Sequence, residues 1–132
     1  MLPEVESIFL RLRSILRKHA ERLSVTADRP GRYCLEGKAG PAAVQAWGGK
    51  VRRAQIPVAW VEIGRSYVSY HLMGMYGNSA VRDGMSKGLK ARMQGKTCFN
   101  FKTEDEALFK ELEQVTDLGV NGFRDAGFIT DQ

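Results

Sequence analysis

The sequence predicts a single α+β domain in which an antiparallel sheet packs on one face against helices from both ends of the chain. Residues 58–63 and 67–73 alternate apolar and polar side chains on either side of Gly64-Arg65, as the arms of a hairpin do. Segments near both ends repeat apolar residues at spacings of three and four, which indicates helices with one buried face. Hairpin-linked strands with such helices are typical of the α+β class.

The composition fits one globular domain spanning residues 1–132, with 43% hydrophobic and 27% charged residues. The first residues include Glu4 and Glu6 and no apolar run, so we expect no signal peptide. No stretch approaches the roughly 20 apolar residues that span a bilayer. Cys34 and Cys98 are too few and too far apart for a disulfide framework or a zinc site. We therefore expect a cytoplasmic protein with two reduced thiols and no membrane partner.

The first helix is predicted from an apolar stripe formed by Leu2, Val5, Ile8, Phe9, Leu12, Ile15 and Leu16. Pro3 suits its first turn, and His19 is expected as an exposed residue at its end, where the helix dipole favours a cation. Residues 28–40 then predict a turn and a short strand at 32–36. Residues 37–55 predict little beyond a candidate short helix at 42–47, which Gly48-Gly49 would end.

The central hairpin is predicted to turn at Gly64-Arg65, because glycine accepts the positive φ that begins a type II′ turn. This turn would place Glu62 opposite Tyr67 and Val58 opposite His71. Val68, Tyr70 and Leu72 are expected to face the helices, with Tyr67, Ser69, His71 and Met73 on the other face. Gly74 and Gly77 mark the bend that ends the second arm.

Beyond the bend, Gly84 and Gly88 predict two short helices within residues 79–93 instead of one long helix. Residues 96–102 alternate as a strand of the same sheet. Thr103 and Glu106 have the spacing of a capping box, which would open a helix that Gly119 ends. The last segment, residues 122–129, is expected as a tail whose apolar residues hold it against the core.

Three stretches of the sequence, YVSYHLMGMYGN, LKARMQGKTCFNFK and EDEALFKEL, resemble the YdhG-like domain family, a bacterial family of unknown function. In that family a YVSxHL strand, a tyrosine-containing bend, a helix ending in LKxRMQGKSCFNFK and a capped helix follow one another. The resemblance covers residues 58 to about 118 and departs at Gly74, where relatives often have proline, and at Gly77. It implies a compact fold with a curved antiparallel sheet, related to YjbR-like and frataxin-like proteins. One relative has been proposed as an iron chaperone, and YjbR-like proteins have been suggested to bind DNA.

Charge is distributed unevenly along the chain, whose net charge is +5. Between residues 82 and 102, Asp83 is the one acidic residue among six basic residues, namely Arg82, Lys87, Lys90, Arg92, Lys96 and Lys102. We name these six residues the basic segment. Residues 103–132 carry 8 acidic residues against Lys110 and Arg124. The basic segment could pair with this acidic tail, form a solvated face, or meet a phosphate or an acidic partner.

The sequence contains no phosphate loop, dinucleotide fingerprint, HExxH helix or GxSxG elbow, so it favours a non-enzymatic binding module without cofactor or metal. His71 is the candidate base, with Glu62 as the candidate group to orient it. We expect a ligand groove lined by Tyr67, His71, Met73 and Tyr76, with Arg92 or Lys96 at its rim. Arg82, Lys87, Lys90 and Lys102 are the further candidate contacts for nucleic acid or a small anionic ligand.

Two alternatives remain open at this stage, an iron-binding chaperone that would use carboxylates and a protein–protein interaction domain. The oligomeric state, monomer or homodimer, is also open.

Overall fold

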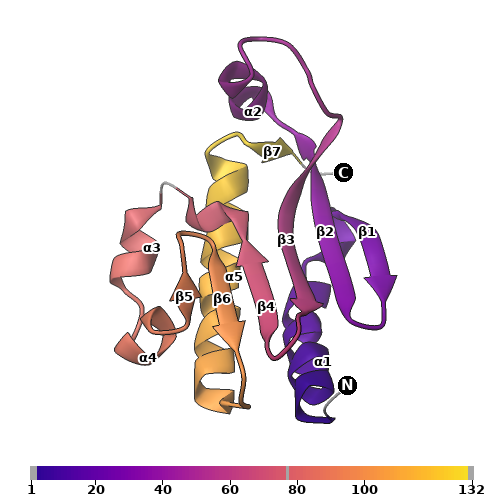
Figure 1. The fold of residues 1–132 in the computed structure, drawn as a ribbon. Coiled ribbons are helices and arrows are strands. Elements are labelled where there is room, and N and C mark those ends of the chain that lie inside the picture. Colours follow the sequence, from indigo (N-terminus) through magenta and orange to yellow (C-terminus); the bar gives the residue numbers. More distant parts are fainter. Residues whose placement is uncertain (1–2, 77, 131–132) are drawn as a thin grey trace.

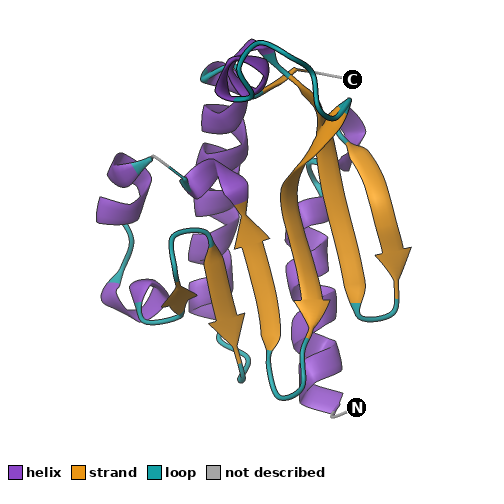
Figure 2. Ribbon diagram, turned by 45° about the horizontal axis from the view of Figure 1, so that its top comes forward, coloured by secondary structure: helices purple, strands orange, loops and turns teal. Residues whose placement is uncertain are grey.

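The computed structural model describes residues 3–76 and 78–130, so Leu2 and Gly77 lie outside the described residues. A sheet forms one layer, and two long helices cover one of its faces (Figures 1 and 2). In chain order the elements are α1 (Pro3–Arg17), the 3₁₀ helix η1 (Ala20–Arg22), β1 (Ser24–Arg29), β2 (Arg32–Ala39), α2 (Pro41–Ala46), β3 (Gln55–Ile63), β4 (Val68–Leu72), the 3₁₀ helix η2 (Met73–Met75), α3 (Ser79–Asp83), α4 (Lys87–Lys90), β5 (Met93–Gln94), β6 (Cys98–Phe101), α5 (Glu106–Asp125) and β7 (Ile129–Thr130).

The sheet has the strand order β1-β2-β3-β4-β6-β5, and the short β7 pairs with β2. All of these strand pairs are antiparallel. The pairing of β6 with β4 confirms that the strand predicted at 96–102 joins the central hairpin. The predicted α+β class, with N- and C-terminal helices on one face of an antiparallel sheet, is confirmed.

The hydrophobic core lies between the sheet and the helices α1 and α5. The stripe predicted for α1 is buried at all of its described positions, Val5, Ile8, Phe9, Leu12, Ile15 and Leu16. From the sheet, Val68, Tyr70 and Leu72 are fully buried against these helices, as predicted. Burying a valine or leucine side chain, such as Val68 or Leu72, stabilises the fold by about 1.5–3 kcal/mol before the loss of conformational entropy is counted.

The turn between β3 and β4 differs from the prediction. Gly64 does not adopt a positive φ, and its N–H donates a hydrogen bond to the Tyr67 carbonyl at 2.8 Å. The connection therefore spans residues 64–67 instead of two residues, and Ile63 lies opposite Val68. The predicted opposition of Glu62 to Tyr67 and of Val58 to His71 is wrong by two positions. Because side chains alternate with a period of two, this shift leaves Glu62 and His71 on their predicted face.

Both predicted ends of α5 are wrong. Asp105, not Thr103, caps the helix, and its carboxylate accepts a hydrogen bond from the Leu108 N–H at 3.2 Å. The expected partner of the capping box, Glu106, instead binds Arg11. At the other end, α5 continues past Gly119 into the segment expected as a tail, because this glycine packs against the sheet instead of ending the helix.

Sequence patterning missed three short strands, β1, β5 and β7. β1 reads SVTADR and buries none of its residues fully, so it lacks the alternation of a half-buried strand. β5 and β7 have two residues each, which is too short for any period to be visible. The candidate helix near residues 42–47 is confirmed as α2, and the two short helices predicted around Gly84 are confirmed as α3 and α4.

The acidic residues of α5 pair with α1, not with the basic segment. Arg11 binds Glu106 through two nitrogens, with the shortest contact at 2.6 Å. His19 Nε2 lies 2.9 Å from Asp117 Oδ1, so His19 is a partly buried partner of α5 instead of an exposed cap. Of the possibilities left open for the basic segment, pairing with the acidic tail is not what the structure shows at Glu106, Glu113 and Asp117, which pair with Arg11, Lys18 and His19. None of the described helices is long and apolar enough to cross a membrane.

Candidate functional site

The sheet face opposite α1 and α5 has no helix over its centre (Figure 2). We name this surface the open sheet face. The strand registers bring to it a set of mostly polar side chains, Arg32, Trp60, Glu62, Ser69, His71, Gln94, Cys98 and Asn100. Most are half-buried, so they pack beside one another and still meet solvent.

A stacked pair of rings occupies the centre of the open sheet face. Trp60 on β3 lies opposite His71 on β4, and the two rings stack with centroids 4.5 Å apart and planes 10° from parallel. His71 Nε2 is 3.3 Å from Ser69 Oγ. Partial burial lowers the pKa of His71; Glu62 acts in the opposite direction, and Arg32 lowers the pKa further. The imidazole is therefore neutral at neutral pH, and the Trp60 ring covers one of its faces.

Cys98 stands next to His71 but is not set up as a nucleophile. Its Sγ lies 3.8 Å from His71 Nε2, and its thiol is within 3.5 Å of Asn100 Oδ1 as acceptor. Burial raises the pKa of the Cys98 thiol, and the charge of Glu62 adds to this effect. Catalytic cysteines need the opposite shift, toward the thiolate.

Glu62 does not hold His71 as the orienting carboxylate of a catalytic base, which is the role that the sequence suggested for it. It lies opposite Ser69 in the sheet, and its carboxylate binds the Arg32 guanidinium at 2.7 Å. The Glu62 carboxylate is therefore held by Arg32, and the Cys98 thiol by Asn100.

We predict that the folded protein loses stability as the pH falls below about 6.5, the ordinary pKa of histidine. Because the folded-state pKa of His71 lies below that of the unfolded chain, the unfolded state takes up the proton first. The contribution of neutral His71 is complete above the unfolded pKa and is lost as the pH falls through the folded pKa. NMR titration of the His71 ring, with and without urea, measures both values. A folded pKa above the unfolded one would contradict the prediction, and His71→Gln should flatten this part of the pH–stability curve.

The basic segment adjoins one edge of the open sheet face. Arg92 and Lys102 line a hollow of about 260 Å³ together with Gln94 and Asn100. The Asn100 side chain donates to Gln94 Oε1 at 2.6 Å, and its backbone N–H donates to the Arg92 carbonyl at 2.8 Å. Asn100 therefore links this hollow to Cys98 and to the stacked rings.

The cations of the basic segment are not neutralised within the fold. Among the residues that the structure describes, no carboxylate lies within ion-pairing distance of Arg82, Lys87, Lys90, Arg92, Lys96 or Lys102. All are exposed except Arg92, which is half-buried. The arginines of α1 differ, because Arg11, Arg13 and Arg17 each have a carboxylate nearby. The positive potential of the basic segment is therefore directed toward solvent.

The residues of the predicted groove fall into three places. Tyr67 lies in the turn at one end of β4, whereas Met73 and Tyr76 follow the other end. There, Lys96 Nζ lies 5.5 Å from the centre of the Tyr76 ring. His71 stays on the open sheet face, on the side that continues to Arg92 through Asn100. A single groove containing all six residues is not formed, because η2 turns the chain away from the sheet after Leu72.

Trp60 is the site residue that sequence reasoning missed, because the register error concealed its position opposite His71. Had the turn been placed at residues 64–67, the alternation of both strands would have predicted this pair.

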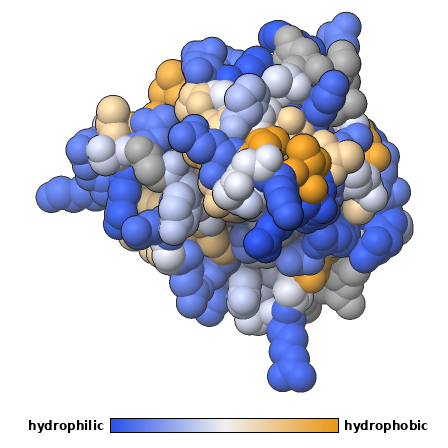
Figure 3. Space-filling view, turned by 90° about the horizontal axis from the view of Figure 1, so that it is seen from above, coloured by the Kyte–Doolittle hydropathy of each residue, from blue (hydrophilic) through white to orange (hydrophobic). Residues whose placement is uncertain are grey.

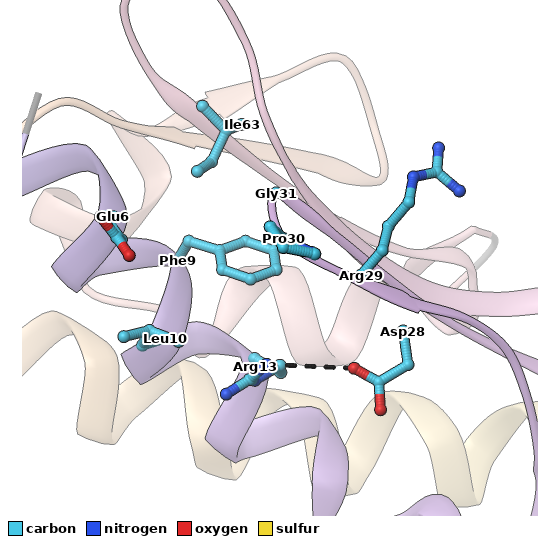
Figure 4. A pocket seen from close by; sticks show the side chains of 9 residues that line it. All are labelled: Glu6, Phe9, Leu10, Arg13, Asp28, Arg29, Pro30, Gly31 and Ile63. Atoms are coloured by element: carbon cyan, nitrogen blue, oxygen red, sulfur yellow. Dashed lines mark ion pairs between the residues drawn. The ribbon is translucent and has the colours of Figure 1, made fainter. Parts of the chain in front are cut away.

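A larger hollow, of about 380 Å³, lies between α1 and the β1–β2 turn, away from the basic segment (Figure 4). Its walls are Phe9, Leu10, Pro30 and Ile63, with charged residues of both signs around them. Arg13 and Asp28 face each other there at 3.9 Å. The mixed signs give this hollow no preference for an anion or a cation.

Among the described residues, no group of three or more His, Cys, Asp or Glu side chains is placed to hold a metal ion. Comparison of the chain with protein-family models, with curated proteins and with solved structures found no match.

Proposed function

We propose that this protein is a non-enzymatic binding module that holds a nucleic-acid strand by its phosphates along the basic segment. The observation that carries the proposal is the set of six cations with no carboxylate partner among the described residues. Exposed cations that are left unpaired in the fold are free to release counterions from a phosphate backbone, which is the main source of affinity in such complexes.

The side chains of the open sheet face favour a nucleic-acid single strand as the ligand over an isolated phosphate ion. Arg92 and Lys102 stand beside the amide groups of Gln94 and Asn100, so charge and hydrogen-bonding groups share one hollow. From there the face continues to the half-buried Trp60–His71 pair, an aromatic surface that unpaired bases could contact. A single strand along this path would meet cations first and then an aromatic surface.

The iron-chaperone alternative is less well supported because three of its candidate carboxylates, those of Asp105, Glu111 and Glu113, already have partners. Asp105 caps α5, and Glu111 accepts hydrogen bonds from the Ser86 N–H and hydroxyl at 2.7 and 2.6 Å. Glu113 pairs with Lys18. An iron ion would have to displace each of these contacts.

The test is the salt dependence of binding to a single-stranded DNA oligonucleotide, measured by fluorescence anisotropy. For single strands, log Kd changes with log salt by about 0.7 for each phosphate contacted. Replacing Lys90, Arg92 and Lys102 together by alanine should lower that slope by about two and weaken binding. Lys90 and Lys102 are exposed, so their loss should affect stability little, and circular dichroism checks that the variant with half-buried Arg92 replaced is folded.

The matched control replaces Lys38, Lys50 and Arg52 by alanine, which removes the same net charge from exposed positions outside the basic segment. This control should keep the wild-type slope. Equal slopes in the two triple variants, or no oligonucleotide binding by the wild type at low salt, would reject the proposal. Binding of pyrophosphate without binding of DNA would assign the basic segment to a small anion instead.

A further inference from the structure

A separate aromatic hollow lies where α2, the start of β3, η2 and the C-terminal part of α5 meet. Its volume is about 280 Å³, and its principal walls are Trp47, Ile56, Met73, Tyr76, Phe123 and Phe128. Figure 3 looks down on the α2 end of the molecule, where apolar side chains in orange gather among hydrophilic ones in blue. We name this hollow the aromatic cavity.

The aromatic rings that line the aromatic cavity are not fully buried in the hydrophobic core. Phe123 and Phe128 stack on each other with centroids 5.2 Å apart and planes 11° from parallel, and both remain partly exposed. Tyr76 is 66% exposed. Large apolar side chains that gather around an open hollow indicate a binding surface more often than isolated exposed residues do. The parallel rings and flat walls favour a planar partner over a branched one.

Two further hollows lead from the aromatic cavity to unpaired cations. The adjoining hollow, of about 320 Å³, shares Tyr76, Phe123 and Phe128 with it and adds Asn78. Asn78 also lines the next hollow, of about 200 Å³, together with Arg82 and Lys96. Lys96 lies over the exposed Tyr76 ring, and neither cation has a carboxylate partner among the described residues. Apolar walls at one end and unpaired cations at the other match a molecule with an aromatic body and an anionic group.

We propose that this path is a site for a small aromatic carboxylate or sulfonate. The ring system lies in the aromatic cavity against Trp47 and Tyr76, and the anionic group points toward Lys96 and Arg82. The volume of the cavity, about 280 Å³, is just below the roughly 300–1,000 Å³ of typical ligand pockets, so a naphthalene-sized body suits it better than a long chain. The site shares Lys96 and Arg82 with the basic segment. It uses neither Arg92, Lys102 nor the open sheet face, so its binding can be tested separately from the proposed nucleic-acid function.

The probe is naphthalene-2-carboxylate, titrated into the full chain by calorimetry, with 2-naphthalenemethanol as its uncharged counterpart. We expect saturable binding of the carboxylate with a dissociation constant below about 1 mM and weaker binding of the alcohol. Tyr76→Ser should weaken carboxylate binding about tenfold by removing a stacking surface. Lys96→Met should weaken binding of the carboxylate about threefold or more and leave binding of the alcohol unchanged.

Matched controls separate this site from general effects. Val25→Ser removes an apolar side chain that is 44% exposed on β1, and Lys90→Met removes a charge from the basic segment outside the path. Both should bind naphthalene-2-carboxylate as the wild type does, with circular dichroism confirming that every variant is folded. Absence of saturable binding, equal affinity for the alcohol and the carboxylate, or equal weakening by the controls would overturn the proposal. Retained binding in the Lys90, Arg92 and Lys102 triple variant would support it whatever the outcome with DNA.

Discussion

Gly74→Ala is expected to destabilise the protein by about 3 kcal/mol, the upper end of the usual cost of forcing extra atoms into a packed core. A Cβ atom at this position would lie 1.9 Å from the carbonyl oxygen of Gly119 and 2.5 Å from its carbonyl carbon. These are backbone atoms of α5, so no side-chain rotation can relieve the overlap. The helix would have to move away from η2 and β4, which opens the core at its centre. A loss of this size is a large part of the roughly 5–15 kcal/mol that stabilises a typical domain.

Urea unfolding followed by circular dichroism measures this loss, and Gly84→Ala is the matched control. A Cβ at Gly84 would meet nothing closer than 3.6 Å, and its φ of −81° suits any residue. The control should be as stable as the wild type or gain about 0.4–1 kcal/mol, because alanine restricts the unfolded chain. Similar unfolding midpoints for Gly74→Ala and the wild type would show that α5 does not need this close approach.

The faces of the central strands were predictable from the sequence, but their partners were not. Alternation decides which side chains are buried, and it survives a register shift of two, so Val68, Tyr70 and Leu72 were correctly predicted in the core. The register depends on the backbone conformation of Gly64, which could adopt a positive φ and does not. Because the predicted turn assumed a positive φ at Gly64, the predicted register did not place Trp60 opposite His71.

The prediction was wrong where a glycine serves close packing between elements instead of ending a helix. Gly119 has the position of a helix stop in the sequence, yet a Cβ there would meet Leu72 Cδ2 at 2.9 Å. Its role is to bring α5 close to β4, and a sequence pattern carries no record of the distance between a helix and a sheet. The end of α5 was therefore placed too early.

The sequence predicted where the positive charge of the candidate site lies. It did not predict which aromatic residues, distant along the chain, meet in the fold. The basic segment is visible in the sequence because its residues are close together along the chain. The aromatic cavity is not, because Trp47 lies in a region with little patterning, and Phe123 and Phe128 were expected only to hold a tail against the core. These residues meet Met73 and Tyr76 only after η2 turns and α5 extends to Asp125.

Phe109→Ala is expected to cost about 3–5 kcal/mol, the range for removing a buried phenylalanine. Phe109 is 1% exposed in the first turns of α5, and its ring meets Phe101 of β6 edge to face with centroids 5.2 Å apart. The substitution removes the buried apolar surface, leaves a cavity, and deletes an aromatic contact worth about 0.5–1.5 kcal/mol beyond its area. Phe109→Leu should cost less, because it keeps most of the volume and loses mainly the ring contact.

Leu118→Ala is the matched control for Phe109→Ala, since it shortens an apolar side chain on the same helix at a position that is 56% exposed. Its effect should stay within about 0.5 kcal/mol. The comparison also concerns the open sheet face, because Phe101 lies on the buried side of β6 and Asn100 lies on its other side. Amide hydrogen exchange in Phe109→Leu should therefore show the largest loss of protection in β6. Equal destabilisation by Phe109→Ala and Leu118→Ala would mean that the contact between β6 and α5 contributes little to holding the sheet on its helices.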